Sequence, residues 1–272
     1  MITRRGLLVG GSVGVAVGVG LGGVVGWEMA PTSVRADVRR ALGRGPEIYI
    51  PDAPEGQVRL EQVTSQYLGG ATDLFTAVPA GHGAGAGLPV IVVLHGSSAS
   101  AAAFREYGLA RFVTAAVQAG APPFVLAGTD DGPDGWVPSA GVDPQAMLRE
   151  ELPGWLHDRG FAADRRALWG WSRGGYGALR YVQVAPDWAR GLALCSPGLL
   201  PGNPVLDDLS PLATLPWGLW CGESDPYHDG AVALSEEAPV APDPWVQGPG
   251  AHTQSYWNDH TLPMMQFLAR TL

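Results

Sequence analysis

Positive charge is scarce in this chain of 272 residues. Its 17 basic residues are outnumbered by 26 acidic ones, which gives a formal net charge of −9 and a pI near 5.0. Because nucleic acids and anionic membrane surfaces are recognised through concentrated positive charge, this balance argues against both as partners. The sequence also lacks basic clusters beyond isolated Arg-Arg pairs, and it contains no internal repeat.

Cysteine is almost absent, with only Cys195 and Cys221 in the chain. Two cysteines exclude a disulfide scaffold and a cysteine-based zinc site. They could pair with each other if the protein is exported. We favour the alternative that both are small buried side chains on neighbouring strands.

Charged residues are missing from residues 6–26, directly after a basic start. This run of 21 residues is long enough to span a bilayer as a helix. The sequence TRRGLL at residues 3–8 is similar to a twin-arginine export signal. Small residues at 34 and 36 offer a cleavage site, whereas Glu28, Pro31 and the length of the run favour an uncleaved anchor.

We therefore expect an exported protein, either secreted or anchored to the outer face of the cytoplasmic membrane through residues 6–26. Residues 1–27 form the predicted signal or membrane-anchor segment. Residues 28–58 contain four prolines among scattered charges and are expected to be a tether. Residues 59–272 are expected to form one folded domain, since 46% hydrophobic composition over this length supplies a large core.

The folded part alternates between strand patterns and helix patterns. Alternating apolar and polar residues at 58–67 and 72–78 predict an antiparallel hairpin around Gly69 and Gly70. The continuous apolar run at 88–94 is typical of a strand that is buried on both faces. Further strands are predicted at 123–127, 166–169, 190–195, 217–222 and 243–247, and helices at 99–119, from 143 onwards with a kink at Pro153, at 174–184 and at 257–272. This order predicts an α/β domain with a mostly parallel sheet and helices on both faces.

The segment Gly170-Trp171-Ser172-Arg173-Gly174 follows one of these strands and precedes a helix. It matches the G-x-S-x-G pattern of a nucleophile elbow, in which a strained turn exposes a serine hydroxyl. Because 39 glycines make chance matches common, the pattern is informative only together with other residues.

Other reactive side chains follow other strands, and in such sheets ligands gather at the carboxyl ends of the strands. Asp225 and Glu223 come after the strand at 217–222, and His252 comes after the last strand. The order serine, acid, histidine is the one expected of a Ser-His-acid triad on this kind of sheet. We therefore predict Ser172 as nucleophile, His252 as general base and Asp225 as its acidic partner, with Glu223 as the rival acid.

The oxyanion of such a reaction needs preorganised donors. The backbone N–H groups of Ser97 and Arg173 are in the expected positions, beside and directly after the nucleophile. His95, Trp136, Trp171 and Trp257 are candidates for the wall of a substrate pocket, although each tryptophan could equally belong to the core.

The acidic loop after residue 129 has two interpretations. Asp130, Asp131 and Asp134 could bind a cation, but their spacing among glycines and a proline fits a turn better. We therefore expect neither a metal nor a cofactor.

The same segments resemble the "putative esterase" branch of the α/β-hydrolase superfamily, which includes esterase D-like enzymes, S-formylglutathione hydrolases and the antigen 85 mycolyltransferases. The matching segments are residues 94–96, 143–153, 170–179, 221–226 and 250–257. The resemblance implies a three-layer α/β-hydrolase fold and a serine hydrolase that acts on small-molecule or lipid carboxylic esters. One departure is Arg173, where this branch often has methionine; its charge could meet an acidic group of a substrate or pair with a nearby carboxylate.

The leading interpretation is thus a carboxylesterase that works through an acyl-enzyme. One alternative is a mycolyltransferase-like acyltransferase of the cell envelope, since an alcohol and water attack the same intermediate. The other is a non-catalytic binding module on a hydrolase scaffold, which would be expected to lack an intact triad. The segment between residues 197 and 216 is short, so we expect a small lid and an open site.

Overall fold

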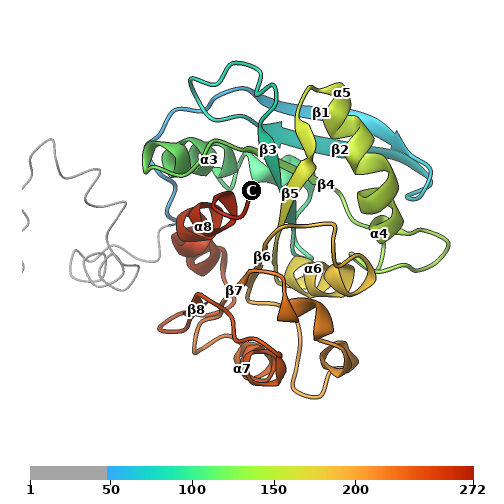
Figure 1. The fold of residues 1–272 in the computed structure, drawn as a ribbon, viewed down its shortest axis with the longest axis vertical. Helices are drawn as coiled ribbons and strands as arrows, with labels where there is room; N and C mark the ends of the chain where they lie inside the picture. The colour runs from blue at the N-terminus through green and yellow to red at the C-terminus, as the bar shows by residue number, and fades with distance from the viewer. Residues whose placement is uncertain (1–47) are drawn as a thin grey trace, which may run out of the picture.

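The eight predicted strands pair into one sheet, in the order β1-β2-β4-β3-β5-β6-β7-β8 (Figure 1). The computed structural model describes residues 48–272. The strands are β1 (Val58–Ser65), β2 (Gly70–Ala77), β3 (Pro89–Leu94), β4 (Val125–Thr129), β5 (Ala162–Trp171), β6 (Leu192–Cys195), β7 (Trp217–Trp220) and β8 (Trp245–Val246). β2 is antiparallel to both β1 and β4, and the strands from β4 to β8 are parallel to one another.

Helices cover both faces of this sheet, so the predicted three-layer fold is confirmed (Figure 1). The helical elements are η1 (Ala101–Phe104), α3 (Leu109–Gln118), α4 (Pro144–Ala146), η2 (Met147–Glu151), α5 (Leu152–Asp158), α6 (Arg173–Val184), η3 (Pro204–Asp207), η4 (Ser210–Ala213), α7 (His228–Glu237) and α8 (Gln254–Ala269). Helices α3 and α8 pack on one face, and α5, α6 and α7 pack on the other.

Strand β3 shows why the sequence contains a continuous apolar run there. Val90, Val92 and Leu94 pack into the core under α5 and α6. Ile91 and Val93 point the other way, into the core under α3 and α8. Side chains alternate between the two faces of a strand, so a central strand with a core on each side needs apolar residues throughout.

Two helices differ from their prediction. The single helix expected at 99–119 is two elements, η1 and α3, separated at Gly108, which has a φ of 75°. The alanine-rich sequence supports helix on both sides, and this one left-handed residue turns the chain between them. The helix from residue 143 continues through Pro153, with a π-helical turn over Met147–Glu151 just before it. The hydrogen-bonding pattern thus changes where Pro153 supplies no backbone N–H, and the expected irregularity takes the form of a π-helical turn that joins two α-helical segments.

The predicted signal or anchor segment, and the predicted tether up to residue 47, lie outside the described residues. The rest of that tether packs on the domain: Asn258 of α8 donates a hydrogen bond of 2.8 Å to the Tyr49 carbonyl, and Arg111 of α3 donates one of 2.9 Å to the Ala53 carbonyl. Residues 48–57 are therefore part of the folded structure. Between residues 48 and 272, no helix combines the length and the apolar character that crossing a bilayer requires.

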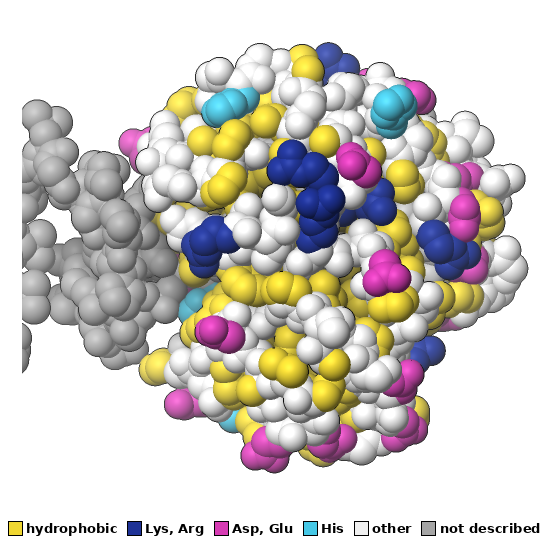
Figure 2. All heavy atoms as spheres, viewed as in Figure 1, with side chains coloured by type: hydrophobic (Ala, Val, Ile, Leu, Met, Phe, Trp, Pro, Cys, Tyr) yellow, Lys and Arg dark blue, Asp and Glu magenta, His cyan; other side chains and the backbone are white. Residues whose placement is uncertain are grey.

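Charge is unevenly distributed over the surface. On the face shown in Figure 2, basic side chains gather near the middle, and acidic ones are spread over the lower and right edges, with a few beside the basic group. Arg165, at the start of β5, donates a hydrogen bond of 3.2 Å to the carbonyl of the C-terminal Leu272. The overall excess of acid thus leaves local regions of positive charge.

Candidate active site

Ser172 occupies the turn between β5 and α6. Its backbone has φ 55° and ψ −124°, a conformation that non-glycine residues rarely adopt. The Ser172 N–H donates a hydrogen bond of 3.0 Å to the Cys195 carbonyl at the end of β6, which ties the strained turn to the sheet. This anchoring holds the serine side chain above the carboxyl ends of the parallel strands.

The two glycines of the elbow are required by close backbone approaches. A Cβ atom at Gly170 would overlap the carbonyl of Gly174, and one at Gly174 would overlap the carbonyl of Leu94 at the end of β3. The strand, the helix and the neighbouring strand are therefore too close for any side chain at these positions. The G-x-S-x-G pattern is in this case a packing requirement.

The three side chains predicted as a triad form one continuous hydrogen-bond chain. Ser172 Oγ lies 2.8 Å from His252 Nε2. His252 Nδ1 lies 3.0 Å and 3.1 Å from the two carboxylate oxygens of Asp225. In the tautomer with the proton on Nδ1, the ring donates to Asp225 and accepts from the serine hydroxyl. This arrangement can move a proton from Ser172 to His252.

Asp225, and not Glu223, is the acid that contacts the histidine. Its carboxylate is fully buried, whereas Glu223 is exposed on the surface. Burial alone would raise the pKa of Asp225, but its hydrogen bonds with His252 and with the Tyr227 N–H outweigh burial and hold that pKa below its usual value. Asp225 is therefore ionised at neutral pH and can stabilise a positive charge on His252.

Two aromatic rings hold His252 from the sides. Tyr227 and Trp257 each lie 5.0 Å from the imidazole, measured between ring centroids, in edge-to-face arrangements. Trp257 was a candidate pocket residue, and it is half-buried here. The contribution of Tyr227 was missed because nothing in the sequence distinguishes an aromatic residue beside a loop acid from an ordinary one.

The turn that carries Ser97 packs directly on the nucleophile. A Cβ atom at Gly96 would lie 3.0 Å from Ser172 Cβ, so the next N–H, that of Ser97, is close to the serine. Within residues 48–272, neither the Ser97 N–H nor the Arg173 N–H donates a hydrogen bond. Both are therefore available to an oxygen atom at the site.

Three of the four candidate pocket residues do not form a pocket wall. His95 and Trp136 are each 1% exposed and Trp171 is 3% exposed, so these side chains belong to the packing beneath the site. Trp136 donates a hydrogen bond of 2.9 Å to the His95 carbonyl. Burial lowers the pKa of His95, whose ring remains neutral.

The acidic loop after β4 has structural contacts. Asp130 accepts hydrogen bonds of 2.9 Å from the Ala101 N–H and 3.1 Å from the Asp73 N–H. Asp131 forms an ion pair of 2.7 Å with Arg173, so this arginine pairs with a nearby carboxylate, which is one of its two predicted roles. In the described part of the chain, no three metal-ligating side chains come together.

Cys195 and Cys221 are both buried and unpaired. They lie at the ends of neighbouring strands β6 and β7, as the favoured prediction has it. Burial raises the pKa of the Cys221 thiol to about 12, which keeps it protonated and unreactive.

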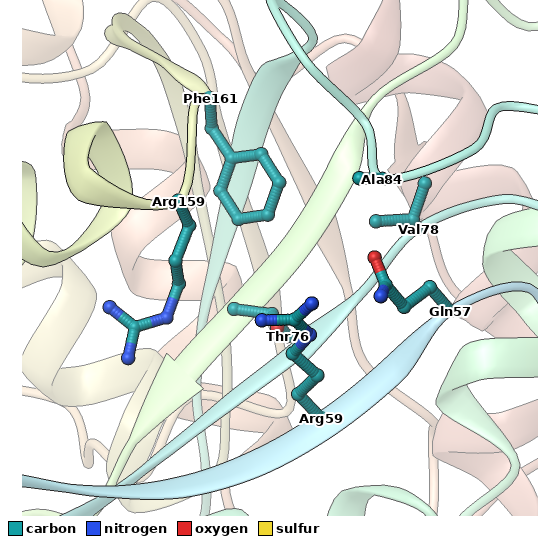
Figure 3. Close-up of a pocket in the computed structure, with 7 residues that line it drawn as sticks. All are labelled: Gln57, Arg59, Thr76, Val78, Ala84, Arg159 and Phe161. Atoms are coloured by element: carbon teal, nitrogen blue, oxygen red, sulfur yellow. The ribbon is translucent and has the colours of Figure 1, made fainter.

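A cavity of about 30 Å³ lies at the other end of the sheet from Ser172. Arg59 extends toward the other lining residues in Figure 3, and Arg159 and Phe161, which lie just before β5, line one side. Ser172 follows the last residue of β5, and ten residues of strand span roughly 33 Å. The cavity is therefore separate from the triad.

The comparisons with known proteins identify the family and the fold of the chain. A family model described as "Putative esterase" matches residues 65–263. A ferulic acid esterase structure has a TM-score of 0.70 at 19% identity and covers 79% of this chain and 99% of its own. An S-formylglutathione hydrolase (FrmB) from Staphylococcus aureus has a TM-score of 0.62 at 14% identity, with coverage of 78% and 98%.

FphF, a fluorophosphonate-binding serine hydrolase of Staphylococcus aureus, has a TM-score of 0.62 at 17% identity, with coverage of 79% and 99%. No curated protein matches the sequence. At these identities the solved structures establish the shared fold.

Proposed function

Because this chain belongs to the "Putative esterase" family and is an esterase by that membership, we propose that it cleaves carboxylic esters through an acyl-enzyme formed on Ser172. One observation carries the proposal: the hydrogen-bond chain from Ser172 through His252 to Asp225. A serine hydroxyl is a weak nucleophile by itself, and this chain supplies the base that it needs.

The reaction follows from the roles of these groups. Ser172 Oγ attacks the ester carbonyl carbon while His252 Nε2 takes the hydroxyl proton. The carbonyl oxygen becomes an oxyanion and accepts hydrogen bonds from the N–H groups of Ser97 and Arg173. His252 then gives its proton to the departing alcohol oxygen, and the carbon–oxygen bond breaks. Water attacks the acyl-enzyme by the same steps, which release the carboxylic acid and restore Ser172.

The segment between β6 and β7 favours the proposal that the substrates are small or extended esters. It contains η3 and η4, and Val205 and Leu212 within it pack into the core beside α6. Gln183 of α6 donates a hydrogen bond of 2.8 Å to the Val205 carbonyl, which fastens the segment to the domain. A segment packed in this way leaves little chain to cover the serine, so we expect an open site.

The site of action is a second part of the proposal. The sequence TRRGLL and the uncharged run at residues 6–26 favour export, and the run favours attachment to the outer face of the cytoplasmic membrane. An esterase placed there would meet esters of the cell envelope or of the medium.

The test combines hydrolysis with labelling of the serine. The purified full-length protein is assayed on p-nitrophenyl esters of increasing acyl length, and on a hydroxycinnamate ester because one structural neighbour is a ferulic acid esterase. A fluorophosphonate should form a covalent adduct on the peptide that contains Ser172, and Ser172→Ala should lose both the adduct and the hydrolysis. Hydrolysis that persists in Ser172→Ala would contradict the proposal.

A further inference from the structure

The loop after β4, residues 130–136, contacts Arg173 directly and contacts the residues on either side of the turn that carries Ser97, the other proposed oxyanion donor. It lies between α6, which begins at Arg173, and the turn that contains Ser97. We infer that this loop sets the separation of the two donors, and that the Asp131–Arg173 ion pair is its positioning element on the α6 side. The inference rests on the proposed function, because an oxyanion hole matters only if Ser172 attacks a carbonyl.

On the Ser97 side, the loop fastens the turn at both ends. Trp136 Nε1 donates a hydrogen bond of 2.9 Å to the carbonyl of His95, before the turn. Asp130 accepts a hydrogen bond of 2.9 Å from the Ala101 N–H, after the turn. Residues 96–100 are thus held at both ends by contacts to one loop, of which the Trp136–His95 hydrogen bond is buried and the Asp130–Ala101 hydrogen bond is partly buried.

On the α6 side, the loop holds the Arg173 side chain. Asp131 Oδ2 lies 2.7 Å from Arg173 Nη2. The backbone of Gly135 lies against the arginine stem, since a Cβ atom there would be 2.7 Å from Arg173 Cδ. Among the described residues, Arg173 Nε has no hydrogen-bond partner, so the ion pair is the polar contact that fixes the guanidinium.

The Asp131–Arg173 ion pair differs from an ordinary ion pair on the protein surface. The Asp131 side chain is 12% exposed and that of Arg173 is 32% exposed, so the pair is partly shielded from water. Arg173 is the first residue of α6, and its own N–H is the proposed donor. We therefore expect that releasing its side chain lets the first peptide of the helix shift. A displacement of about 1 Å in a reacting group can cost about a hundredfold in rate.

The variants Arg173→Met and Asp131→Ala test this role, because both keep every backbone donor. The two substitutions leave the N–H groups in place and change the local charge in opposite directions, so a similar loss in both variants reports the position of the donor and not the charge beside it. Each variant is expected to lower kcat about 10- to 100-fold on a neutral p-nitrophenyl ester at nearly unchanged KM. The double variant should lose no more than the worse single variant, and Arg173→Lys should recover part of the loss.

A phenylboronic acid provides the readout that is specific for the oxyanion hole. Ser172 Oγ adds to boron, its proton passes to His252, and a boronate oxygen takes the place of the oxyanion. Binding of the boronate should weaken in each variant by the same factor as kcat/KM. If the ion pair were only structural, the variants would have a lower melting temperature, but their losses in boronate binding and in kcat/KM would not match.

The Glu61–Arg159 ion pair is the matched control. Its 2.9 Å contact is at the opposite end of β5, and Glu61→Gln and Arg159→Met are expected to leave kcat within about twofold. Unchanged kcat in Arg173→Met, or a change in KM confined to charged substrates, would overturn the inference. If the wild type neither hydrolyses esters nor reacts with a fluorophosphonate at Ser172, the proposed function fails instead, so the two failures are distinguishable.

Discussion

The Asp225 carboxylate is fully buried, yet it stays charged because two hydrogen bonds replace the water that it has lost. A buried charge acts on its neighbours with little screening. Its nearest ionisable neighbour is His252, which must become positive when it takes the serine proton. Glu223 is only two residues away, but its carboxylate is exposed to water, which would screen its charge and weaken its effect on His252.

Asp225→Asn is expected to lower kcat by about 10⁴, the scale known for loss of the triad acid. The amide keeps the size of the side chain but presents N–H groups, which favour the wrong tautomer of His252. Glu223→Gln is the matched control and should keep kcat within about twofold. Steady-state kinetics on a short p-nitrophenyl ester measures both, and equal losses in the two variants would contradict the assignment.

His95 is expected to make stability depend on pH. Burial lowers its pKa in the folded state, whereas in the unfolded chain the pKa is about 6.5. Below pH 6.5 the unfolded state therefore binds a proton that the folded state does not, so the free energy of unfolding falls as the pH falls toward the folded-state pKa. Above about pH 6.5 this contribution is fully present.

Urea unfolding of wild type and His95→Gln between pH 5 and pH 8 measures the effect. The variant should show a shallower loss of stability below pH 6.5 than the wild type. His82→Gln, in an exposed turn, is the control and should follow the wild-type curve. Parallel curves for wild type and His95→Gln would mean that His95 takes up its proton equally in both states.

Single residues also show where the sequence was informative. Ser172, Asp225 and His252 were found because each follows a strand in the expected order, and the topology of a parallel sheet brings strand ends together. Whether the side chains of Trp136 and Trp171 are buried in the core or face a pocket could not be inferred in this way. An aromatic residue near a strand end can point into the core or out of it, and only the packing of the neighbouring layers decides between them.

At the scale of elements, all eight strands were predictable: the antiparallel pair β1 and β2 from its alternation of apolar and polar residues, and the parallel strands from short apolar runs between turn residues. Helix α7 was not predicted. Its sequence, HDGAVALSEE, has a weak apolar stripe, and it contains Gly230 where a side chain would overlap the carbonyl of Leu199. The helix thus depends on tertiary packing, which overrides its poor local pattern.

The glycine between η1 and α3 allows a test of how residues 48–57 pack on the domain. Gly108 has a positive φ, and a Cβ atom there would overlap the side chain of Ile50. Gly108→Ala should therefore lower the free energy of unfolding by about 2–4 kcal/mol, from backbone strain plus displacement of Ile50.

Gly120→Ala is the matched control for this substitution. Gly120 also has a positive φ, of 94°, but open space surrounds the position of its Cβ atom. Gly120→Ala should lower the free energy of unfolding only by the backbone strain, about 1–2 kcal/mol. Chemical denaturation compares the two variants, and equal costs would show that Ile50 does not pack on Gly108 in solution.

At the scale of the whole molecule, the two cores on either side of the sheet support a site that lies at one edge of it. The elbow is fixed from both sides: Gly174 packs on β3, and the Ser172 N–H bonds to β6. Because the nucleophile rests on the central strands, changes in peripheral elements such as α7 should alter stability more than chemistry.

Export of the whole chain is the last expectation, and it depends on an arginine pair. Arg4→Lys together with Arg5→Lys keeps the positive charge beside the uncharged run at 6–26 but removes the pair itself. If the pair is a recognised export signal, the double variant should accumulate in the cytoplasm of a bacterial host that has a twin-arginine system. Fractionation followed by ester hydrolysis and immunoblotting measures the distribution.

The chain carries its own control in a second arginine pair, Arg39 and Arg40, outside the signal-like segment. Lysine at both of these positions should leave export at the wild-type level, because charge and composition change in the same way but the segment at 3–8 does not. Export that is insensitive to both double substitutions would mean that the apolar run alone directs the protein, since it would then be the remaining feature of the segment able to do so.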